Sequence, residues 1–336
     1  MRSQEFKPIF NMGSLRDALR AGDCPIGAAD DVACFLARKH ISTPTHPAND
    51  DSRARTEAAL FAWPFEESER CADAQSVRED RALVSAAGEM HAVFAAQAPL
   101  CSVHGDVNTG AAVLSESGSC EVVEQESFLG CSAVDTGTLF AHLLFAVIDN
   151  AVRGEVVGDE NGPANVPAWP PAKPSSKSKV HGMISSAWRS YLTEARAGGC
   201  IRSDADDLDL LRLTAGFAGC ELIRRVLGSG HADDGPGAPS PAAPLRAQKA
   251  ALALGRKLLL FRAKLQDIDS FLVRSPLTSA HRDALGAPWP GPQAAPSLAG
   301  TPLKDARGRA IRATASQARP WALARHHVPR APDPYR

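Results

Sequence analysis

The segment 104–110, with the sequence His-Gly-Asp-Val-Asn-Thr-Gly, places Asp106 on a tight turn directly after a glycine. A carboxylate in such a turn can accept a hydrogen bond or a proton from the hydroxyl group of a bound molecule. Eighteen residues further on, after a short apolar run, Glu124 and Glu126 form a second acidic site. Carboxylates there can bind a magnesium ion that bridges phosphate groups. Together, the two acidic sites could serve the transfer of a phosphate group to a bound hydroxyl group.

Each of these residues also has a plain structural interpretation. An aspartate after a glycine is common in turns of every kind, so Asp106 could be an ordinary turn residue. His104 is expected to support the loop by hydrogen bonding and not to titrate during a reaction. For Glu124 and Glu126 two alternatives stay open, a magnesium site and a solvated acidic turn that binds no ion.

The wider pattern resembles S-methyl-5-thioribose kinase, a small-molecule kinase related to the aminoglycoside and choline kinases. That family reads His-Gly-Asp-Leu-His-Thr-Gly-Ser at its catalytic loop and Asp-Pro-Glu at its metal site, which correspond here to 104–111 and 124–126. The run 216–225 is close to the family's Gly-Phe-Ala-Gly-Cys-Glu-Met-Ile-Arg-Arg, with leucine in place of methionine. Weaker similarity lies elsewhere, and the resemblance covers most of residues 15–262.

The resemblance implies ATP-dependent phosphorylation of the 1-hydroxyl group of methylthioribose, a step of methionine salvage. In that case Asp106 is the catalytic base, His104 belongs to the same catalytic loop, and Glu124 and Glu126 hold the metal. Mg²⁺ and ATP are then the implied cofactors, although no ATP-binding residue can be named in this sequence. The implied partner is a small sugar, and the resembled enzymes suggest a homodimer as the assembly.

Three further residues take roles from the same resemblance. Arg224 and Arg225 match an arginine pair that meets the substrate near the transferred phosphate. Asp135 matches an aspartate that supports the catalytic loop. The alternative for two adjacent arginines on a helix is that one is exposed and one pairs with an acid, and Glu221 provides such an acid at helical spacing.

The chain departs from the family pattern at the predicted metal site. Glu124 replaces an aspartate, and its extra methylene moves the carboxylate in a site that tolerates little misplacement. Gln125 replaces a proline that would stiffen the turn. Ala111 stands where related kinases place an oxygen ligand for the second magnesium ion, and alanine offers none. Asn108 is near in sequence but starts from another point of the loop.

The ATP-binding half of a kinase is not visible in the sequence. The residues before His104 contain no Gly-x-Gly-x-x-Gly loop and no strand with a phosphate-binding lysine. We therefore expect a large lobe whose small ATP-binding lobe is missing. Three functional hypotheses follow: a truncated or complete small-molecule kinase, a catalytically silent relative that binds or regulates, and a scaffold that acts through its C-terminal tail.

The hydrophobic pattern predicts the elements that would position this loop. The fold class is α+β and mostly helical, like the large lobe of a kinase, with a small β-hairpin around the catalytic loop. Residues 40–56, rich in Pro, Thr, Asn and Asp, are predicted to form a loop. Helices are expected at 30–39, 66–97, 178–197, 205–228 and 244–273, and short strands at 100–103, 112–114 and 120–123.

Composition suggests three regions along the chain. Residues 1–60 are expected to form a partial region that connects the lobes. Residues 61–273 are expected to form the large lobe, with a flexible insertion at 154–177 that is rich in Pro, Ser and Lys. Residues 274–336 are expected to be a basic, Pro/Ala-rich disordered tail.

Composition also limits the functional classes. The 336 residues carry a net charge of −1 and are 44% hydrophobic, which allows a sizeable core and gives no polyanion-binding signature. We therefore expect no nucleic-acid partner. The eight cysteines form no Cys-x-x-Cys pair, so a structural zinc site is not expected. No secretory signal and no membrane-spanning run is evident, and the chain is expected to be cytoplasmic.

Overall fold

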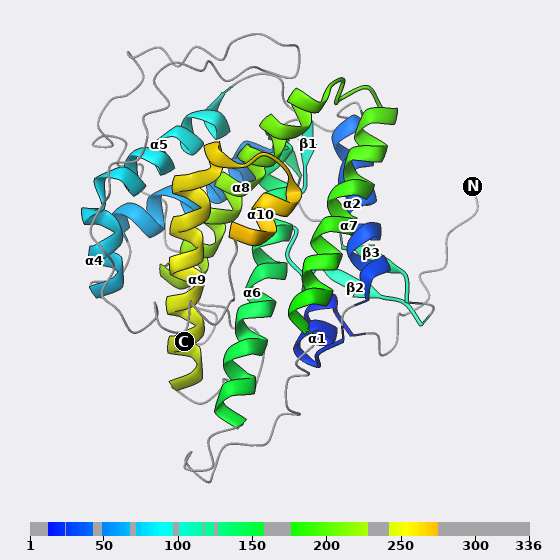
Figure 1. Cartoon of the computed structure of the whole chain (residues 1–336). Coiled ribbons are helices and arrows are strands. Elements are labelled where there is room, and N and C mark those ends of the chain that lie inside the picture. The colour runs from blue at the N-terminus through cyan, green and yellow to red at the C-terminus, as the bar shows by residue number, and fades with distance from the viewer. Residues whose placement is uncertain are drawn as a thin grey trace, which may run out of the picture.

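The computed structural model of the chain describes the residues that surround the predicted catalytic loop (Figure 1). The described residues are 13–23, 25–42, 49–67, 72–96, 101–116, 118–123, 127–157, 176–227 and 242–274. The predicted tail and most of the predicted insertion lie outside them.

Helices make up most of the described chain, as the predicted fold class requires. They are α1 (Leu15–Arg20), α2 (Ile26–Ile41), α3 (Asp50–Glu57), the π-helix η1 (Ala58–Glu67), α4 (Ala72–Glu79), α5 (Arg81–Ala95), α6 (Ala133–Val157), α7 (Ser176–Ala197), α8 (Asp204–Leu227), α9 (Ala242–Phe261), the 3₁₀ turn η2 (Arg262–Lys264) and α10 (Ile268–Arg274).

The described strands form two small antiparallel pairs. The strands are β1 (Cys101–Val103), β2 (Ala112–Leu114), β3 (Cys120–Val122) and β4 (Phe128–Gly130). β1 pairs with β4, with Ser102 opposite Leu129, and β2 pairs with β3 as a hairpin, with Val113 opposite Glu121. The predicted catalytic loop joins β1 to β2, so both of its ends are held by a strand pair.

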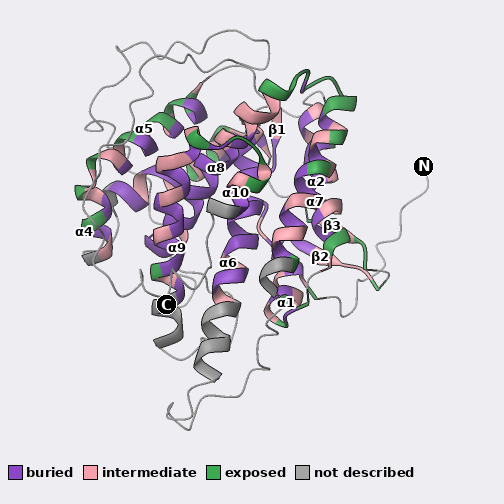
Figure 2. Cartoon of the chain, in the orientation of Figure 1, coloured by how far each residue is buried: buried purple, intermediate pink, exposed green. Residues whose placement is uncertain are grey.

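The core lies between α6, α8 and α9, which run side by side through the middle of the molecule (Figures 1 and 2). Gly219 on α8 and Gly255 on α9 meet at a helix crossing. A Cβ atom on Gly219 would lie 2.7 Å from the carbonyl oxygen of Gly255, and one on Gly255 would lie 2.9 Å from that of Gly219. Because only glycine allows this approach, the two helices pack backbone to backbone.

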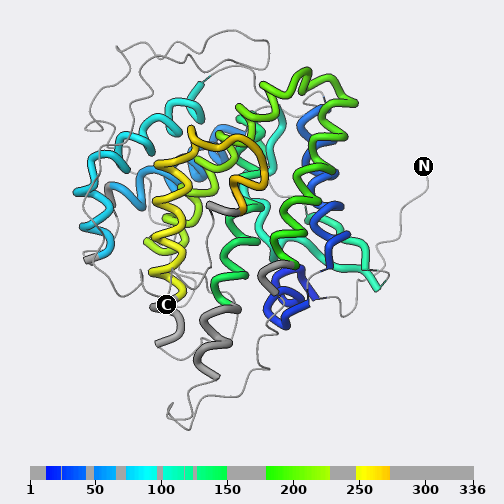
Figure 3. The backbone as a smooth tube through the Cα atoms, viewed as in Figure 1, coloured from blue at the N-terminus to red at the C-terminus, as the bar shows by residue number. Residues whose placement is uncertain are grey.

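A second helix pair, α2 and α7, covers the strands on one side (Figure 3). The pair joins parts of the chain that are far apart in sequence, and at its surface Arg38 donates to Glu194 at 2.7 Å. The C-terminal parts of the same two helices carry His40 and Tyr191, which are both buried. This pair therefore brings polar groups up to the rear of the β1–β2 loop.

The structure differs from the expectations at several element boundaries. Residues 50–56 were expected to be loop but begin α3, because the Asn49 side chain accepts the N–H of Ser52 and starts a helix. The helix expected at 66–97 is divided, since Asp80 caps a new helix by accepting the N–H of Leu83 at 3.1 Å.

The last predicted helix, 244–273, is also divided. It ends at Phe261, and α10 begins after Asp267 accepts the N–H of Ser270 at 2.6 Å. At the predicted insertion, α6 continues to Val157 and α7 begins at Ser176, so helices extend into both ends of 154–177. Strand β4 was not predicted.

In the described part of the chain, no helix is both long and apolar enough to cross a membrane.

Candidate active site

The loop that follows β1 turns sharply at Gly105. Its φ angle is +85°, and a Cβ atom there would lie 2.4 Å from the ring of Phe128 on β4. Both observations exclude a side chain, because L residues rarely adopt this backbone conformation and the ring fills the space. The glycine lets the chain reverse within one residue, so that Asp106 points away from the strands.

Asp135, in the first turn of α6, holds this turn from behind. Its Oδ2 accepts the N–H of His104 at 2.7 Å, and its Oδ1 accepts the N–H of Gly105 at 2.8 Å. Burial alone would raise the pKa of this fully buried carboxyl, but a hydrogen bond from His40 and the two backbone N–H groups lower the pKa below its usual value. Asp135 therefore supports the loop as a carboxylate.

The side chain of His104 is held by hydrogen bonds on both ring nitrogens. Nε2 lies 2.9 Å from the carbonyl oxygen of Val123, to which it donates, and Nδ1 accepts the N–H of Asp106 at 3.3 Å. A ring that donates at one nitrogen and accepts at the other is the neutral tautomer. In this arrangement His104 joins the loop to the β2–β3 hairpin.

The end of the loop is closed by Asn108. Its Oδ1 accepts the N–H groups of Gly110 and Ala111, at 2.9 and 3.2 Å, and also a guanidinium N–H of Arg16 at 2.9 Å. Three donors on one carbonyl oxygen leave no lone pair for a metal ion. Asn108 therefore does not replace the ligand that Ala111 lacks.

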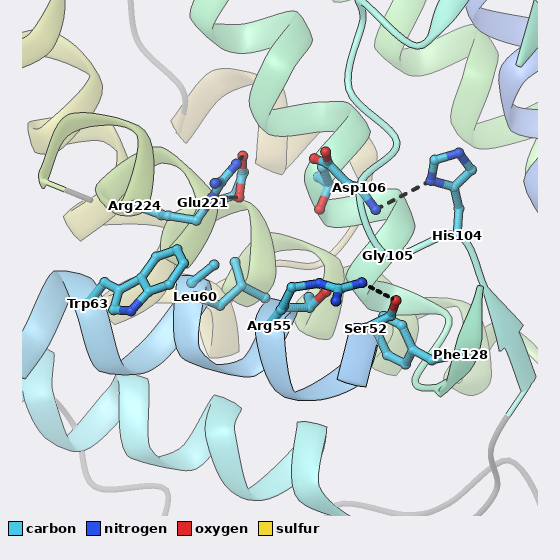
Figure 4. Close-up of a pocket in the computed structure, with 13 residues that line it drawn as sticks. Ser52, Arg55, Leu60, Trp63, His104, Gly105, Asp106, Phe128, Glu221 and Arg224 are labelled. Atoms are coloured by element: carbon cyan, nitrogen blue, oxygen red, sulfur yellow. Dashed lines mark hydrogen bonds and ion pairs between the residues drawn. The ribbon is translucent and has the colours of Figure 1, made fainter. Parts of the chain in front are cut away.

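A cavity of about 490 Å³ opens in front of the loop (Figure 4). This size is typical of small-molecule sites. The loop contributes one wall, α8 another, and the helical segment α3–η1 the opposite one. The lining residues are Ser52, Arg55, Thr56, Ala59, Leu60, Trp63, His104, Gly105, Asp106, Phe128, Thr138, Glu221 and Arg224.

Asp106 carries one of the two carboxyl groups among the residues that line this cavity, and the other belongs to Glu221. Burial raises the pKa of Asp106, and the negative charge of Glu221 raises it further, while Arg224 opposes part of the shift. A carboxylate with a raised pKa binds a proton more strongly than an ordinary aspartate. Asp106 is therefore suited to accept a proton from a hydroxyl group placed in the cavity.

Glu221 and Arg224 form a rigid ion pair on α8. The Nε atom of Arg224 donates to Oε2 at 2.7 Å, and an Nη atom donates to Oε1 at 2.6 Å. His142 on α6 lies 3.3 Å from the same Oε1. Burial would raise the pKa of Glu221, but Arg224 and His142 outweigh it and hold the pKa well below its usual range. The bidentate geometry fixes the guanidinium at the cavity wall.

The two adjacent arginines take different positions. Arg224 lines the cavity, whereas Arg225 lies outside the lining residues. An Nη atom of Arg225 lies 3.3 Å from Nε2 of His142, and its guanidinium lies 5.2 Å from the centre of the Phe145 ring. The structure therefore brings only one of the predicted pair to the site, and the pairing with Glu221 considered from the sequence involves that same arginine.

The opposite wall of the cavity was not predicted from the sequence. Arg55 and Thr56 of α3 line the cavity. Arg55 lies across the cavity from Asp106 and donates to the hydroxyl of Ser52 at 2.8 Å (Figure 4). Leu60 and Trp63 come from the π-helix η1, which contains Pro64. Proline has no N–H for a regular helical hydrogen bond, and a widened turn there is a common feature of functional sites.

The described residues do not complete a magnesium site. Within them, no three His, Cys, Asp or Glu side chains gather in a way that could hold a metal ion. The predicted ligands Glu124 and Glu126 lie outside the described residues. The carboxylate of Glu221 is already held by Arg224 and His142.

The chain is similar in sequence to curated methylthioribose kinases, which confirms the resemblance carried by its motifs. It is 28% identical to the enzyme of Bacillus pumilus (strain SAFR-032) over 271 residues, which cover 75% of this chain and 66% of that protein. It is 29% identical to that of Erwinia tasmaniensis over 230 residues, which cover 65% and 56%. The chain thus spans between half and two thirds of the length of these relatives. No protein-family model matches it.

Among solved structures, the chain is similar to a glucosamine kinase. The match covers 77% of this chain and 58% of the kinase chain, with 17% sequence identity and a TM-score of 0.41. A superposition this loose carries no argument about the fold or the reaction.

Proposed function

We propose that this chain forms the sugar-binding and catalytic part of an ATP-dependent kinase that phosphorylates the 1-hydroxyl group of methylthioribose. The observation that carries the proposal is the pairing of Asp106, whose pKa is raised, with the fixed guanidinium of Arg224 in one small-molecule cavity. The sequence similarity to curated methylthioribose kinases supports the identity of the substrate. Glu124 and Glu126 remain the proposed magnesium ligands, and the ATP-binding lobe is proposed to come from outside residues 15–262.

In the proposed reaction Asp106 accepts a hydrogen bond from the 1-hydroxyl group of the sugar. As that oxygen attacks the terminal phosphorus of ATP, its proton passes to the carboxylate and the bond to the leaving ADP breaks. Arg224 stabilises the negative charge that develops nearby, because its position is already set by Glu221. Leu60 and Trp63 contribute apolar side chains to the lining of the cavity.

Binding and transfer can be tested separately. Calorimetric titration of the full chain with methylthioribose should give a dissociation constant between about 1 μM and 1 mM, as is usual for enzyme substrates. Ribose, which lacks the methylthio group, should bind at least tenfold more weakly. Absence of methylthioribose binding to the folded chain would overturn the proposed substrate.

Phosphoryl transfer is measured with Mg-ATP on the full chain and on a fusion that carries the ATP-binding lobe of a methylthioribose kinase ahead of Met1. Replacing Asp106 by Asn should lower the rate by about 10²–10⁴, the usual contribution of general base catalysis. The control Asp269→Asn, an exposed residue of α10, should leave the rate unchanged. Equal rates for Asp106→Asn and the parent would exclude Asp106 as the base.

A second function is favoured by the locked side chain of Asn108 and by Ala111. Because neither offers an oxygen to a second metal ion, the chain could bind the sugar without transferring phosphate. Binding of methylthioribose without any transfer, in the fusion as well as in the full chain, would support this silent binding module.

A further inference from the structure

A buried chain of hydrogen bonds runs from α7 through α2 to the rear of the catalytic loop. The Tyr191 hydroxyl lies 2.8 Å from Nδ1 of His40, and Nε2 of His40 lies 3.0 Å from Oδ2 of Asp135. The same carboxylate accepts the N–H groups of His104 and Gly105. Three helices thus meet the loop through a single carboxylate.

The side chains of Tyr191, His40 and Asp135, which together form this relay of hydrogen bonds, are all shielded from water. The exposed fractions are 7% for His40, 3% for Tyr191 and 0% for Asp135. Neither His40 nor Tyr191 lines the cavity. They are therefore in no position to touch a substrate, and any effect they have on the reaction must pass through Asp135 and the loop.

The charge state of Asp135 fixes the direction of each hydrogen bond. Because its pKa is lowered, the carboxylate can only accept, so Nε2 of His40 must carry a proton. Burial raises the pKa of Tyr191 well above its usual value, so its hydroxyl keeps its proton and can donate to Nδ1. Each ring nitrogen of His40 then has one fixed partner.

The hydrogen bond from His40 prevents the carboxylate of Asp135 from rotating about its terminal torsion. Its Oδ2 serves both His40 and the N–H of His104, while Oδ1 serves Gly105. Without the proton of His40, the carboxylate could rotate about its terminal torsion, and one of the two loop N–H groups would lose its acceptor. Gly105 directly precedes Asp106, so such a rotation changes where the catalytic carboxyl points.

We propose that His40 and Tyr191 are positioning residues, which fix the orientation of Asp135 and through it the backbone that presents Asp106. Their role in catalysis rests on the proposed kinase function, whereas their effect on the loop does not. A fixed partner behind a ligand or catalytic group commonly tunes that group from outside the site. Here it acts across the interface between α2 and α7.

Tyr191→Phe is the sharpest variant because it removes one oxygen and keeps the ring. That ring packs parallel to Trp188, with centroids 6.2 Å apart, and edge-on to His40. Trp188→Phe is the matched control, since it alters the same aromatic stack and removes neither the hydrogen bond from Tyr191 to His40 nor that from His40 to Asp135. His40→Gln tests the next link, because glutamine retains a donor of similar length.

The test uses the ¹⁵N-labelled full chain and needs no activity. In the unmutated protein, the His40 ring nitrogens should report a proton on Nε2 and none on Nδ1. In Tyr191→Phe, amide exchange at His104 and Gly105 should rise at least tenfold relative to core amides of α8, and Trp188→Phe should not produce this local change. His40→Gln should raise exchange at the same two amides by less than His40→Ala.

Three results would overturn the proposal. These are a His40 ring protonated on Nδ1 alone, a uniform rise in exchange over the whole core in Tyr191→Phe, and unchanged exchange at the two loop amides. Where transfer is measurable, kcat should fall while KM changes less than twofold, and a fall confined to KM would count against positioning. Failure of methylthioribose to bind would defeat the proposed function and leave the exchange and tautomer results standing.

Discussion

The two sides of the loop at 104–110 hold two aspartates in opposite electrostatic states, of which Asp135 is fully buried and Asp106 is partly buried. On the helix side, Asp135 accepts hydrogen bonds from His40 and from two backbone N–H groups, and its pKa is lowered. On the cavity side, Asp106 faces Glu221, and its pKa is raised by burial and by that neighbouring charge. The backbone of Gly105 connects these two environments, because its N–H donates to Asp135 and the next residue along the chain is Asp106.

The opposite pKa shifts suit the two aspartates to different roles, Asp135 to supporting the loop and Asp106 to accepting a proton. A carboxylate whose donors are all in place has no capacity left for a substrate, and its ionised form stabilises the fold. A carboxylate held near another negative charge costs stability, but it is a better proton acceptor. The loop therefore combines one carboxylate that fixes geometry with one that can do chemistry, and each can be altered separately.

The largest expected effect lies on the helix side. Asp135→Ala removes the acceptor of three donors and leaves buried N–H groups without a partner. Removing one partner from a buried charged network typically costs about 3–5 kcal/mol. The free energy of unfolding, measured by urea denaturation at neutral pH, should fall by this amount.

The exposed residue Asp269 provides the control, because Asp269→Ala should change the free energy of unfolding by less than about 0.5 kcal/mol. A loss for Asp135→Ala as small as that of the control would show that the helix side of the loop does not depend on this carboxylate.

A smaller effect is expected on the rate of phosphoryl transfer, and it should differ between the two adjacent arginines of α8. Arg224→Lys keeps the charge but loses the bidentate contact with Glu221, so phosphoryl transfer should fall about tenfold, equivalent to about 1.4 kcal/mol. Arg225→Lys should change the rate less than twofold, because Arg225 lies outside the cavity lining. Equal losses in the two variants would mean that the cavity assigned here is not where transfer occurs.

Local patterns in the sequence predicted much of the fold. Within the helix predicted at 66–97, Leu83, Ala87, Met90 and Phe94 recur at helical spacing and are all buried. The three predicted strands around the loop are present. The two wrongly predicted long helices fail at Asp80 and near Asp267. At each of these places an aspartate side chain caps a new helix, and this local hydrogen bond divides the helix although the apolar residues continue at helical spacing.

The candidate site was predicted only where its residues lie close together in sequence. The loop around Asp106 has its own motif, whereas His40 lies 95 residues from Asp135 and 151 from Tyr191. A single histidine in an amphipathic helix gives no signal of such a partner. The wall carrying Trp63 was missed for another reason, since Pro64 suggests a helix end and the structure forms a π-helix instead.

The smallest expected effect is a gain in stability on the cavity side. The folded protein raises the pKa of Asp106, so the folded state binds this proton more strongly than the unfolded chain does. Stability from this group is therefore fully present below the unfolded pKa and is lost as the pH rises through the folded pKa. At neutral pH the ionised carboxyl is a net cost, and Asp106→Asn should raise the melting temperature by a few degrees, about 2–4 °C per kcal/mol.

The sign of that gain should depend on pH, which distinguishes it from a packing effect. Melting curves of Asp106→Asn and the parent should converge as the pH falls below the pKa of aspartate in the unfolded chain, because both side chains are then uncharged, and should separate as the pH rises through the folded pKa. Asp135→Asn should behave in the opposite way. Its carboxylate has a lowered pKa, so the stability it provides is present above the unfolded pKa and is lost as the pH falls through the folded one. If both variants shifted the melting temperature in the same direction at neutral pH, the two sides of the loop would not differ in the way their hydrogen bonds and charges require.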